Sequence, residues 1–592
     1  MGSVDVVRVH FFRPGGREDM PLSRDTEYPV RVDERPAGIF RSPWDQADLD
    51  EKIRVLRHAN DLQRPTIGTL KDMGKELGAA LFAVPGIDAG LRRALGALPV
   101  LDLQLDYPEL ARIPWELVSW NTEPYGHVIG DGVSVVRAVP ARVVVDRGAQ
   151  WPTGRNLALE VLFVWGAGQP VPHQAHEEAL RAACDRYGVD IVCQEVETIA
   201  QLTKLCSKRP PFHFVHILAH GTQTEDGNWG LSLRGEHAKP EQVARAVCAG
   251  GKTPALVTLS ACDSAADLHN GFGSVAYQLH AYGIPFVIGS QFRQREDDSV
   301  LSVAGIYEEL LGGGDLRSLL VGVRRNLFAA DDGGWANEVV YNRYPFEDLE
   351  DLAVVARQQG VLRCANAIDR RARKAQPSEY GALIEELELQ AQKLAALIAE
   401  EKRHDPKPRP EILSETCGLL ASMRRRQSRL RAGPGGESAV DLRAVREAYL
   451  DGLRADANSH YCGINAIHLS FRLGEPERAK EWIPIVRFAV DSQIRAGTDF
   501  WAQATLADLE IYSGNREGAI DQYTKFVNLV QANDDVRGIR AIADTLLASL
   551  RPLEDLLKLE NLSPDVRAAG AAAIDIVARA HRRAAEASEQ RV

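Results

Sequence analysis

The chain has 592 residues, too many for one hydrophobic core, so about two to four domains are expected. Its 70 lysines and arginines against 82 aspartates and glutamates give a net charge of −12, which argues against a protein that coats nucleic acid or an anionic membrane. The longest apolar runs are shorter than the roughly 18 residues needed to cross a bilayer, and no secretion signal opens the chain. The eight cysteines are scattered without a CxxC pair, as in a reducing compartment. We therefore expect a soluble, cytoplasmic protein that binds neither membranes nor, directly, nucleic acid.

Two segments with different patterns open the chain. Residues 1–66 mix short apolar runs with Pro, Gly and Arg, which predicts a small strand-rich N-terminal segment. In residues 67–345, apolar runs such as LALEVLFVWG, FHFVHILA and ALVTLS alternate with amphipathic stretches such as AHEEALRAACDRYG. This alternation predicts an α/β domain, with a mostly parallel sheet and helices on both faces. Such sheets carry their reactive groups just beyond the carboxyl ends of the strands.

After this domain the pattern is helical throughout. Residues 346–376 are expected to form a helical linker, and residues 377–592 an all-α, repeat-type C-terminal domain rich in Ala, Leu, Glu and Arg. The arginine run MRRRQSRLR (423–431) could attract an acidic partner, but runs of this kind are more often a solvated helix face.

A repeat is visible within the helical part. Gly474 and Ala479 recur as Gly514 and Ala519, each 40 residues later (514 − 474 = 519 − 479 = 40). This spacing is typical of helix-turn-helix repeats, in which one hairpin buries its apolar face only against a stacked neighbour. We expect these helical repeats to bind peptides or proteins.

Three histidines in FHFVHILAHGTQ (212–223) raise the question of a metal site. On a helix, His213, His216 and His220 would lie near one face. The segment, however, has room for only about eight apolar residues between turn signals, the length of a buried strand. In a strand, at about 3.3 Å per residue, His213 points away from the other two, so one zinc ion cannot bind all three. We expect a strand and no metal, and HQAHEE (173–178) is expected to begin a surface helix.

His220 and Cys262 are the candidate catalytic pair. His220 ends one predicted strand and is followed by Gly221, whereas Cys262 directly follows another, ALVTLS. If the two strands are neighbours, the imidazole and the thiol meet above one edge of the sheet, where the amino end of a following helix would favour thiolate. A thiolate and an imidazole in contact can cleave an amide bond. The spacing alone leaves open the alternative that both side chains are ordinary core residues.

The segments HILAHG and LSACDSA resemble the CHAT peptidases, a branch of the caspase and separase clan with a caspase-like α/β fold. Further matches are LPVLDLQLDYPELARIPWELV, SVVRAVP, GIPFVIGSQF, YEELLGGGDLRSLLVGVRRNL, Trp335 and Tyr341. The resemblance covers roughly residues 67–345. It implies that His220 is the general acid and base, that Cys262 is the nucleophile, and that the N–H groups of Gly221 and Cys262 form the oxyanion hole. No third catalytic side chain, metal or cofactor is implied.

Substrate specificity is less clear from the resemblance. In relatives that cleave after basic residues, an acidic side chain lines the first pocket, and Asp263, Glu296, Asp297 and Asp298 are the candidates here. The alternative that we favour for the last three is a solvated helix start. The stretch QFRQREDD also has two arginines where the family usually has a turn containing proline.

The C-terminal part resembles the helical TRAF-binding domain of apoptosis-signal-regulating kinases, which is related to tetratricopeptide repeats. The matching stretches are LSETCGLLASM, HYCGINAIHLSFRLG and DFWAQATLADLEIYSGN, within residues 377–592. The resemblance implies a recruitment or regulatory module. Asn465 and Trp501 lie in these stretches, and we expect both to hold helices together.

Together these patterns predict a cysteine endopeptidase that cleaves a partner protein in a limited, regulated way, in bacterial defence or signalling, with a regulatory protein or signal bound by the helical repeats. The rival hypothesis is a catalytically idle caspase-like scaffold that assembles partners. Metal-dependent hydrolysis is a third possibility, for which we expect no support.

Overall fold

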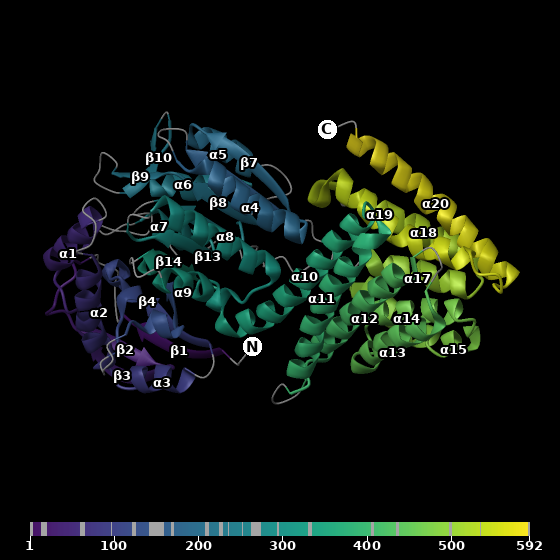
Figure 1. Cartoon of the computed structure of the whole chain (residues 1–592), viewed down its shortest axis with the longest axis horizontal. Helices are drawn as coiled ribbons and strands as arrows, with labels where there is room; N and C mark the ends of the chain where they lie inside the picture. The colour runs from purple at the N-terminus through teal and green to yellow at the C-terminus, as the bar shows by residue number, and fades with distance from the viewer. Residues whose placement is uncertain are drawn as a thin grey trace. The chain divides into compact units, whose positions relative to one another are not determined.

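The structure is a computed structural model of the chain. It describes residues 4–13, 20–59, 66–95, 98–120, 126–140, 159–166, 171–207, 212–223, 229–234, 236–250, 253–261, 274–292, 295–329, 334–403, 408–433, 437–496, 500–532 and 534–589. The chain forms two compact units, which divide within one helix between Ala356 and Arg357. Figure 1 shows that the first unit contains the strands and that the second is helical.

An 11-stranded sheet forms the centre of the first unit. In spatial order its strands are β3 (Arg35–Phe40), β2 (Tyr28–Val32), β1 (Val4–Phe11), β4 (Leu98–Leu105), β5 (Ser134–Ala138), β14 (Glu338–Asn342), β13 (Phe286–Ser290), β12 (Leu256–Ser260), β8 (Phe214–Leu218), β6 (Glu160–Gly166) and β7 (Asp190–Val196). Seven of the ten neighbouring pairs are parallel. The predicted α/β class with a mostly parallel sheet is confirmed.

Helices and a small second sheet accompany the main sheet. The helices are α1 (Gln46–Ala59), α2 (Thr66–Phe82), α3 (Ile87–Ala94), α4 (His173–Tyr187), α5 (Ile199–Cys206), α6 (Pro240–Val247), α7 (Val275–Ala281), α8 (Glu296–Gly312) and α9 (Val321–Ala329). The small sheet contains β9 (His220–Gln223), β10 (Trp229–Ser232) and β11 (His237–Ala238). All five residues of β8 are buried, as expected of a strand that is covered on both faces.

The N-terminal strands belong to the main sheet. β1 pairs in parallel with β4 along its whole length, and β2 and β3 continue the sheet outward in antiparallel order. β1 can occupy this position because its buried residues alternate with less buried ones, so one face packs inward. The strands expected in residues 1–66 are therefore present, and they extend the sheet of the following residues.

The second unit is built from helices. They are α10 (Phe346–Ala372), which is shared with the first unit, and then α11 (Tyr380–Glu401), α12 (Pro410–Ala432), α13 (Ala439–Ala455), α14 (His460–Arg472), α15 (Pro476–Lys480), α16 (Ile483–Ala496), α17 (Phe500–Tyr512), α18 (Arg516–Ala532), α19 (Asp534–Leu557) and α20 (Pro564–Glu589). Among the described residues of the whole chain, no helix combines the length and apolar character needed to span a membrane.

The 40-residue repeat corresponds to two helical hairpins. α14 and α17 end in the same way, at Gly474 and Gly514, with φ angles of +72° and +71°. In both turns the glycine N–H bonds the carbonyl three residues earlier, and the next N–H bonds the carbonyl five residues before it. Ala479 and Ala519 are both fully buried. The sequence repeat is thus a repeat of turn geometry and packing.

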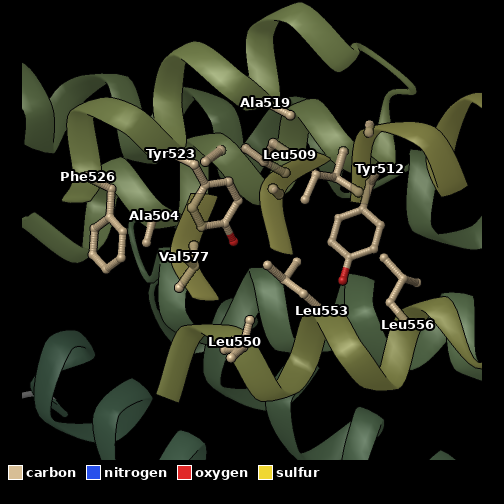
Figure 2. Close-up of a cluster of buried hydrophobic side chains, with 14 of the residues drawn as sticks. Ala504, Leu509, Tyr512, Ala519, Tyr523, Phe526, Leu550, Leu553, Leu556 and Val577 are labelled. Atoms are coloured by element: carbon tan, nitrogen blue, oxygen red, sulfur yellow. The ribbon is translucent and has the colours of Figure 1, made fainter. Parts of the chain in front are cut away.

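A hydrophobic cluster joins the last helices (Figure 2). Tyr512 and Tyr523 lie among aliphatic side chains of α17 to α20, and burial of each such aliphatic side chain contributes roughly 1.5–3 kcal/mol. Trp501 packs at the edge of the cluster, with its ring centroid 5.9 Å from that of Phe526. Asn465 donates to the Tyr461 carbonyl of its own helix. Both contacts stabilise helices.

Candidate active site

Two neighbouring strands end side by side at the carboxyl edge of the main sheet. β8 and β12 are parallel and in register from Phe214 opposite Leu256 to Leu218 opposite Ser260. The Ala219 N–H then donates to the Ser260 carbonyl at 3.3 Å. His220 and Cys262 each lie two residues beyond the last register pair. The predicted strand is therefore present, and the two strands that precede the candidate dyad are neighbours.

His220 lies where the main sheet gives way to the small one. It is the first residue of β9 and is opposite Ser232 of β10, while Gly221 is opposite Leu231. Only Ala219 separates β8 from β9, and both His220 and Gly221 are partly exposed. The imidazole is thus placed at a sheet edge and within reach of solvent, as a proton-transferring group requires.

Cys262 and Asp263 lie outside the described residues. The structure describes the strand that leads to them as far as Ala261, which is buried, and resumes with Ser274. The Ser274 hydroxyl caps α7 by accepting from the Tyr277 N–H. The roles of Cys262 as nucleophile and of its N–H in an oxyanion hole remain predictions.

The other acidic candidates form the start of a helix. Glu296, Asp297 and Asp298 occupy the first turn of α8, where negative charge is favoured by the helix dipole. Glu296 and Asp297 are exposed, whereas Asp298 is buried. The helix start that the sequence suggested is present, and a role for these residues in a substrate pocket remains a prediction.

The remaining histidines of the 212–223 segment have separate partners. The His213 imidazole Nδ1 accepts from the Glu160 N–H at the beginning of β6, at 3.3 Å. His216 is buried within β8 and bonds Thr258 and His176. Within the described part of the chain, no group of three His, Cys, Asp or Glu side chains is arranged to hold a metal ion.

A chain of buried hydrogen bonds crosses beneath the strand ends. The Tyr307 hydroxyl lies 3.1 Å from the Thr258 Oγ1, which lies 2.6 Å from the His216 Nδ1. The His216 Nε2 lies 3.2 Å from the His176 Nδ1, and the His176 Nε2 lies 3.0 Å from the Ser299 Oγ. The chain therefore links α8, β12, β8 and α4.

The last link sets the direction of every proton in this chain. The Ser299 hydroxyl donates to the Glu296 carbonyl, so it accepts from the His176 Nε2–H. The His176 Nδ1 then accepts from the His216 Nε2–H, and the His216 Nδ1 accepts from Thr258. This assignment holds because both imidazoles are neutral. Burial lowers the pKa of His176 to about 4 and that of His216 well below its ordinary value.

His176 is a part of the site that the sequence reasoning missed. α4 begins at His173, where a surface helix was expected, but His176 is fully buried against the sheet. Its position could have been inferred, because His176, Leu180, Ala183 and Cys184 recur at helical spacing and are the buried residues of α4. The apolar stripe of the helix includes the histidine.

A small cavity with both polar and apolar lining adjoins this network between the sheet and α8. The volume in which the centre of a water molecule could lie is about 10 Å³, close to the minimum needed for one ordered water. Its lining includes His216, Thr258, Ser290, Ser302 and Glu338. The Ser302 hydroxyl donates to the Glu338 carboxylate, whose pKa is raised chiefly by burial. This cavity is too small for a peptide side chain.

The motif Pro114-Trp115-Glu116 supplies a buried ion pair. Glu116 accepts from the Nε and Nη2 of Arg137, and Arg137 also donates to the Ala111 carbonyl at 2.9 Å. The Gln291 amide lies just beyond β13 and bonds both Glu116 and Arg137. These side chains stabilise the centre of the sheet unit.

In the first unit, a mostly parallel sheet places His220 just beyond one strand, and the strand that leads toward Cys262 is its parallel neighbour. The family model of the CHAT domain matches residues 71–341, so this part of the chain is similar to CHAT domains. CHAT domains belong to the caspase-like peptidase clan.

Other comparisons add little. No curated protein matches the chain significantly. A solved "Circular tandem repeat protein with novel repeat topology and enhanced subunit contact surfaces" is 13% identical, with 92% of this chain and 97% of that chain covered, but its TM-score is 0.17. Similarity at this level supports no conclusion about fold or function.

Proposed function

We propose that the chain is a cysteine endopeptidase in which Cys262 attacks the carbonyl carbon of a peptide bond and His220 transfers the proton to the leaving amine. The observation that carries this proposal is the register of β8 and β12, in which Leu218 lies opposite Ser260. His220 and Cys262 follow these two residues at equal distance along the chain. Adjacent parallel strands that end at the same edge of the sheet support a dyad of these two residues.

Hydrolysis then proceeds in two stages. The Cys262 sulfur forms a thioester with the acyl part of the substrate while the C–N bond breaks and the amine leaves with a proton from His220. Water next attacks the thioester, with His220 as general base, and releases the carboxylate and the free thiol. Backbone N–H groups near Gly221 and Cys262 are proposed to stabilise the oxyanion in both stages.

The substrate is proposed to be a partner protein that is cleaved at few sites. The helical unit supports this idea, because stacked helical repeats usually bind peptides or proteins. We propose that it binds a regulatory protein or signal in a bacterial defence or signalling pathway. If the helical unit restrains the peptidase, a chain shortened to residues 1–345 cleaves the partner faster than the full chain. Equal rates would argue against this regulation.

Loss of cleavage in two variants tests the proposal. Extracts that contain the partner are incubated with the wild-type chain, with Cys262→Ala or with His220→Ala, and new protein N-termini are then identified. We expect specific new termini with the wild-type chain and none with either variant. His237→Ala serves as the control, because His237 is exposed on β11. The same termini from Cys262→Ala would disprove the proposal.

Alkylation tests it without a known substrate. Burial raises the pKa of Cys193, Cys248 and Cys417 to about 11 and those of Cys184 and Cys206 further, so these thiols hold almost no thiolate at pH 7. Iodoacetamide should therefore modify Cys262 first, and His220→Ala should slow that reaction. Modification of Cys262 no faster than of these five would favour a catalytically idle scaffold.

A further inference from the structure

One arginine of the 423–431 run is buried without a hydrogen-bond partner. Arg425 lies on α12 with only 7% of its surface exposed, whereas its neighbour Arg424 is exposed. The Nε and Nη2 atoms of Arg425 are inaccessible to solvent and donate to no acceptor. A buried guanidinium normally has a carboxylate, phosphate or carbonyl partner, because desolvation of an unpaired charge is costly. The expected solvated face therefore has one member turned inward.

Other arginines of this chain bind carboxylates through the same two atoms, Nε and Nη2, that have no partner in Arg425. Four other arginines each donate through Nε and Nη2 to the two oxygens of one carboxylate, in the pairs Arg54–Glu51, Arg137–Glu116, Arg317–Asp315 and Arg409–Glu401. This edge of a guanidinium matches a planar pair of oxygens. In Arg425 the same edge is buried and has no acceptor, so its donors suit an anion with at least two oxygens.

Further charged groups surround Arg425 and leave a positive excess. The Glu437 Oε2 lies 2.5 Å from the Nη1 of Arg472 and 3.8 Å from the Nε of Arg429. Arg429 also bonds Asp555, at 3.4 Å. Three arginines thus face two carboxylates, which leaves one positive charge (3 − 2 = +1). That charge resides on Arg425, since the other two arginines have partners.

His468 provides a third donor at the same place. Its Nδ1 lies 2.8 Å from the Tyr512 hydroxyl, while its Nε2 is buried without a partner. Burial, followed by the charges of Arg425, Arg472 and Arg429, lowers the pKa of His468, so the imidazole is neutral. When Tyr512, whose ring lies inside the cluster of Figure 2, donates to Nδ1, the proton of His468 is on Nε2.

Two helices supply this basic cluster with matching spacing. Arg425 and Arg429 lie four residues apart on α12, and His468 and Arg472 lie four residues apart on α14, so each pair shares a helix face. The side chain of Arg429 is 42% exposed and that of Arg472 is 15% exposed. The cluster therefore extends from the surface, at these two residues, to the buried Arg425.

We propose that Arg425, His468, Arg429 and Arg472 form a binding site for the phosphate group of a small molecule. Three unused donor atoms, two on Arg425 and one on His468, match the three terminal oxygens of a phosphate better than the two oxygens of a carboxylate. The exposed Arg429 and the partly exposed Arg472 attract the anion and mark its entrance. The ligand would join α12 to α14 and so report the presence of a phosphorylated small molecule to the repeat unit.

Titration calorimetry with inorganic phosphate tests the site on the full-length chain. Wild-type protein should bind phosphate at one site, in a buffer whose ionic strength is held constant with chloride. Arg425→Met should weaken binding by about tenfold or more, because the bidentate contact is lost. Arg425→Lys keeps the charge without the two-nitrogen edge and should lie in between. Arg424→Met, the exposed neighbour, should leave affinity within about twofold.

Thermal unfolding gives a second readout, which begins with the wild-type chain. Phosphate should raise the wild-type Tm more than chloride does at equal ionic strength, since a ligand bound to the native state stabilises it. Without phosphate, Arg425→Met should unfold no earlier than wild type, because it removes an unpaired buried charge.

The proposal is overturned if wild type gives no heat and no Tm difference, or if Arg425→Met binds phosphate as wild type does. Destabilisation by both Arg425→Met and Glu437→Gln without phosphate would instead show that Glu437 is the partner of Arg425.

Discussion

Glu116 and Arg137 form an ion pair in the interior of the first unit, with side chains 0% and 1% exposed. The pair is held on several sides, because Arg137 also donates to the Ala111 carbonyl and the Gln291 amide contacts both residues. Each charge depends on the other for its stability in a medium of low dielectric constant.

Breaking this pair should destabilise the sheet unit strongly. Arg137→Met leaves the Glu116 carboxylate buried without its main partner, which should cost about 3–5 kcal/mol in the free energy of unfolding measured in urea. The double variant Glu116→Gln and Arg137→Met should lose less than the sum of the single variants. Arg186→Met is the control, because Arg186 and Glu308 pair at the surface and such pairs contribute about 0–1 kcal/mol. Equal losses for Arg137→Met and Arg186→Met would contradict the structural role.

The neutral histidines beneath the site should make stability depend on pH. The pKa of His176 falls from 6.5 in the unfolded chain to about 4 in the folded one, so the unfolded state binds the proton more tightly. The contribution of neutral His176 is complete above pH 6.5 and is lost as pH falls toward 4, up to about 3 kcal/mol. His176→Gln should reduce the slope of unfolding free energy against pH in this window, whatever its effect on stability at pH 7. The exposed His237→Gln variant should keep the wild-type slope, and an unchanged slope in both would refute the assignment.

The two repeat turns allow a matched pair of substitutions. Gly474 and Gly514 have nearly the same positive φ, so alanine at either position should cost about 1 kcal/mol in backbone strain. A Cβ at Gly474 meets nothing within 4 Å, whereas one at Gly514 lies 3.0 Å from the Cβ of Asp565. Gly514→Ala should therefore lower Tm more than Gly474→Ala does. Gly381→Ala, within α11 and in open space, should not lower Tm, since alanine favours a helix. A smaller decrease in Tm for Gly514→Ala than for Gly474→Ala would contradict this prediction and show that the Asp565 side chain moves aside.

The sheet and its strand ends could be predicted because short apolar runs alternate with amphipathic stretches. This pattern placed β8 and β12 in one sheet, and the register of Leu218 with Ser260 makes them neighbours. The partners of buried polar groups could not be predicted in this way. Glu116 and Arg137 are 21 residues apart, and Thr258 is 42 residues from His216, so nothing local links either pair.

The inward position of Arg425 was also beyond sequence reasoning. A run of three arginines predicts a solvated helix face. This prediction holds when the helix packs against neighbours on one face only. α12 contacts α11, α13 and α14, so it presents more than one face to neighbours and one arginine of the run must turn inward. The number of neighbours that a helix has is a property of the whole fold.

The short link between β8 and β9 has one more consequence. His220 hydrogen-bonds within the ladder of β9 and β10, yet its main chain is tied through a single residue, Ala219, to the ladder of β8 and β12. A displacement of the small sheet of β9, β10 and β11 would therefore be transmitted directly to the His220 imidazole.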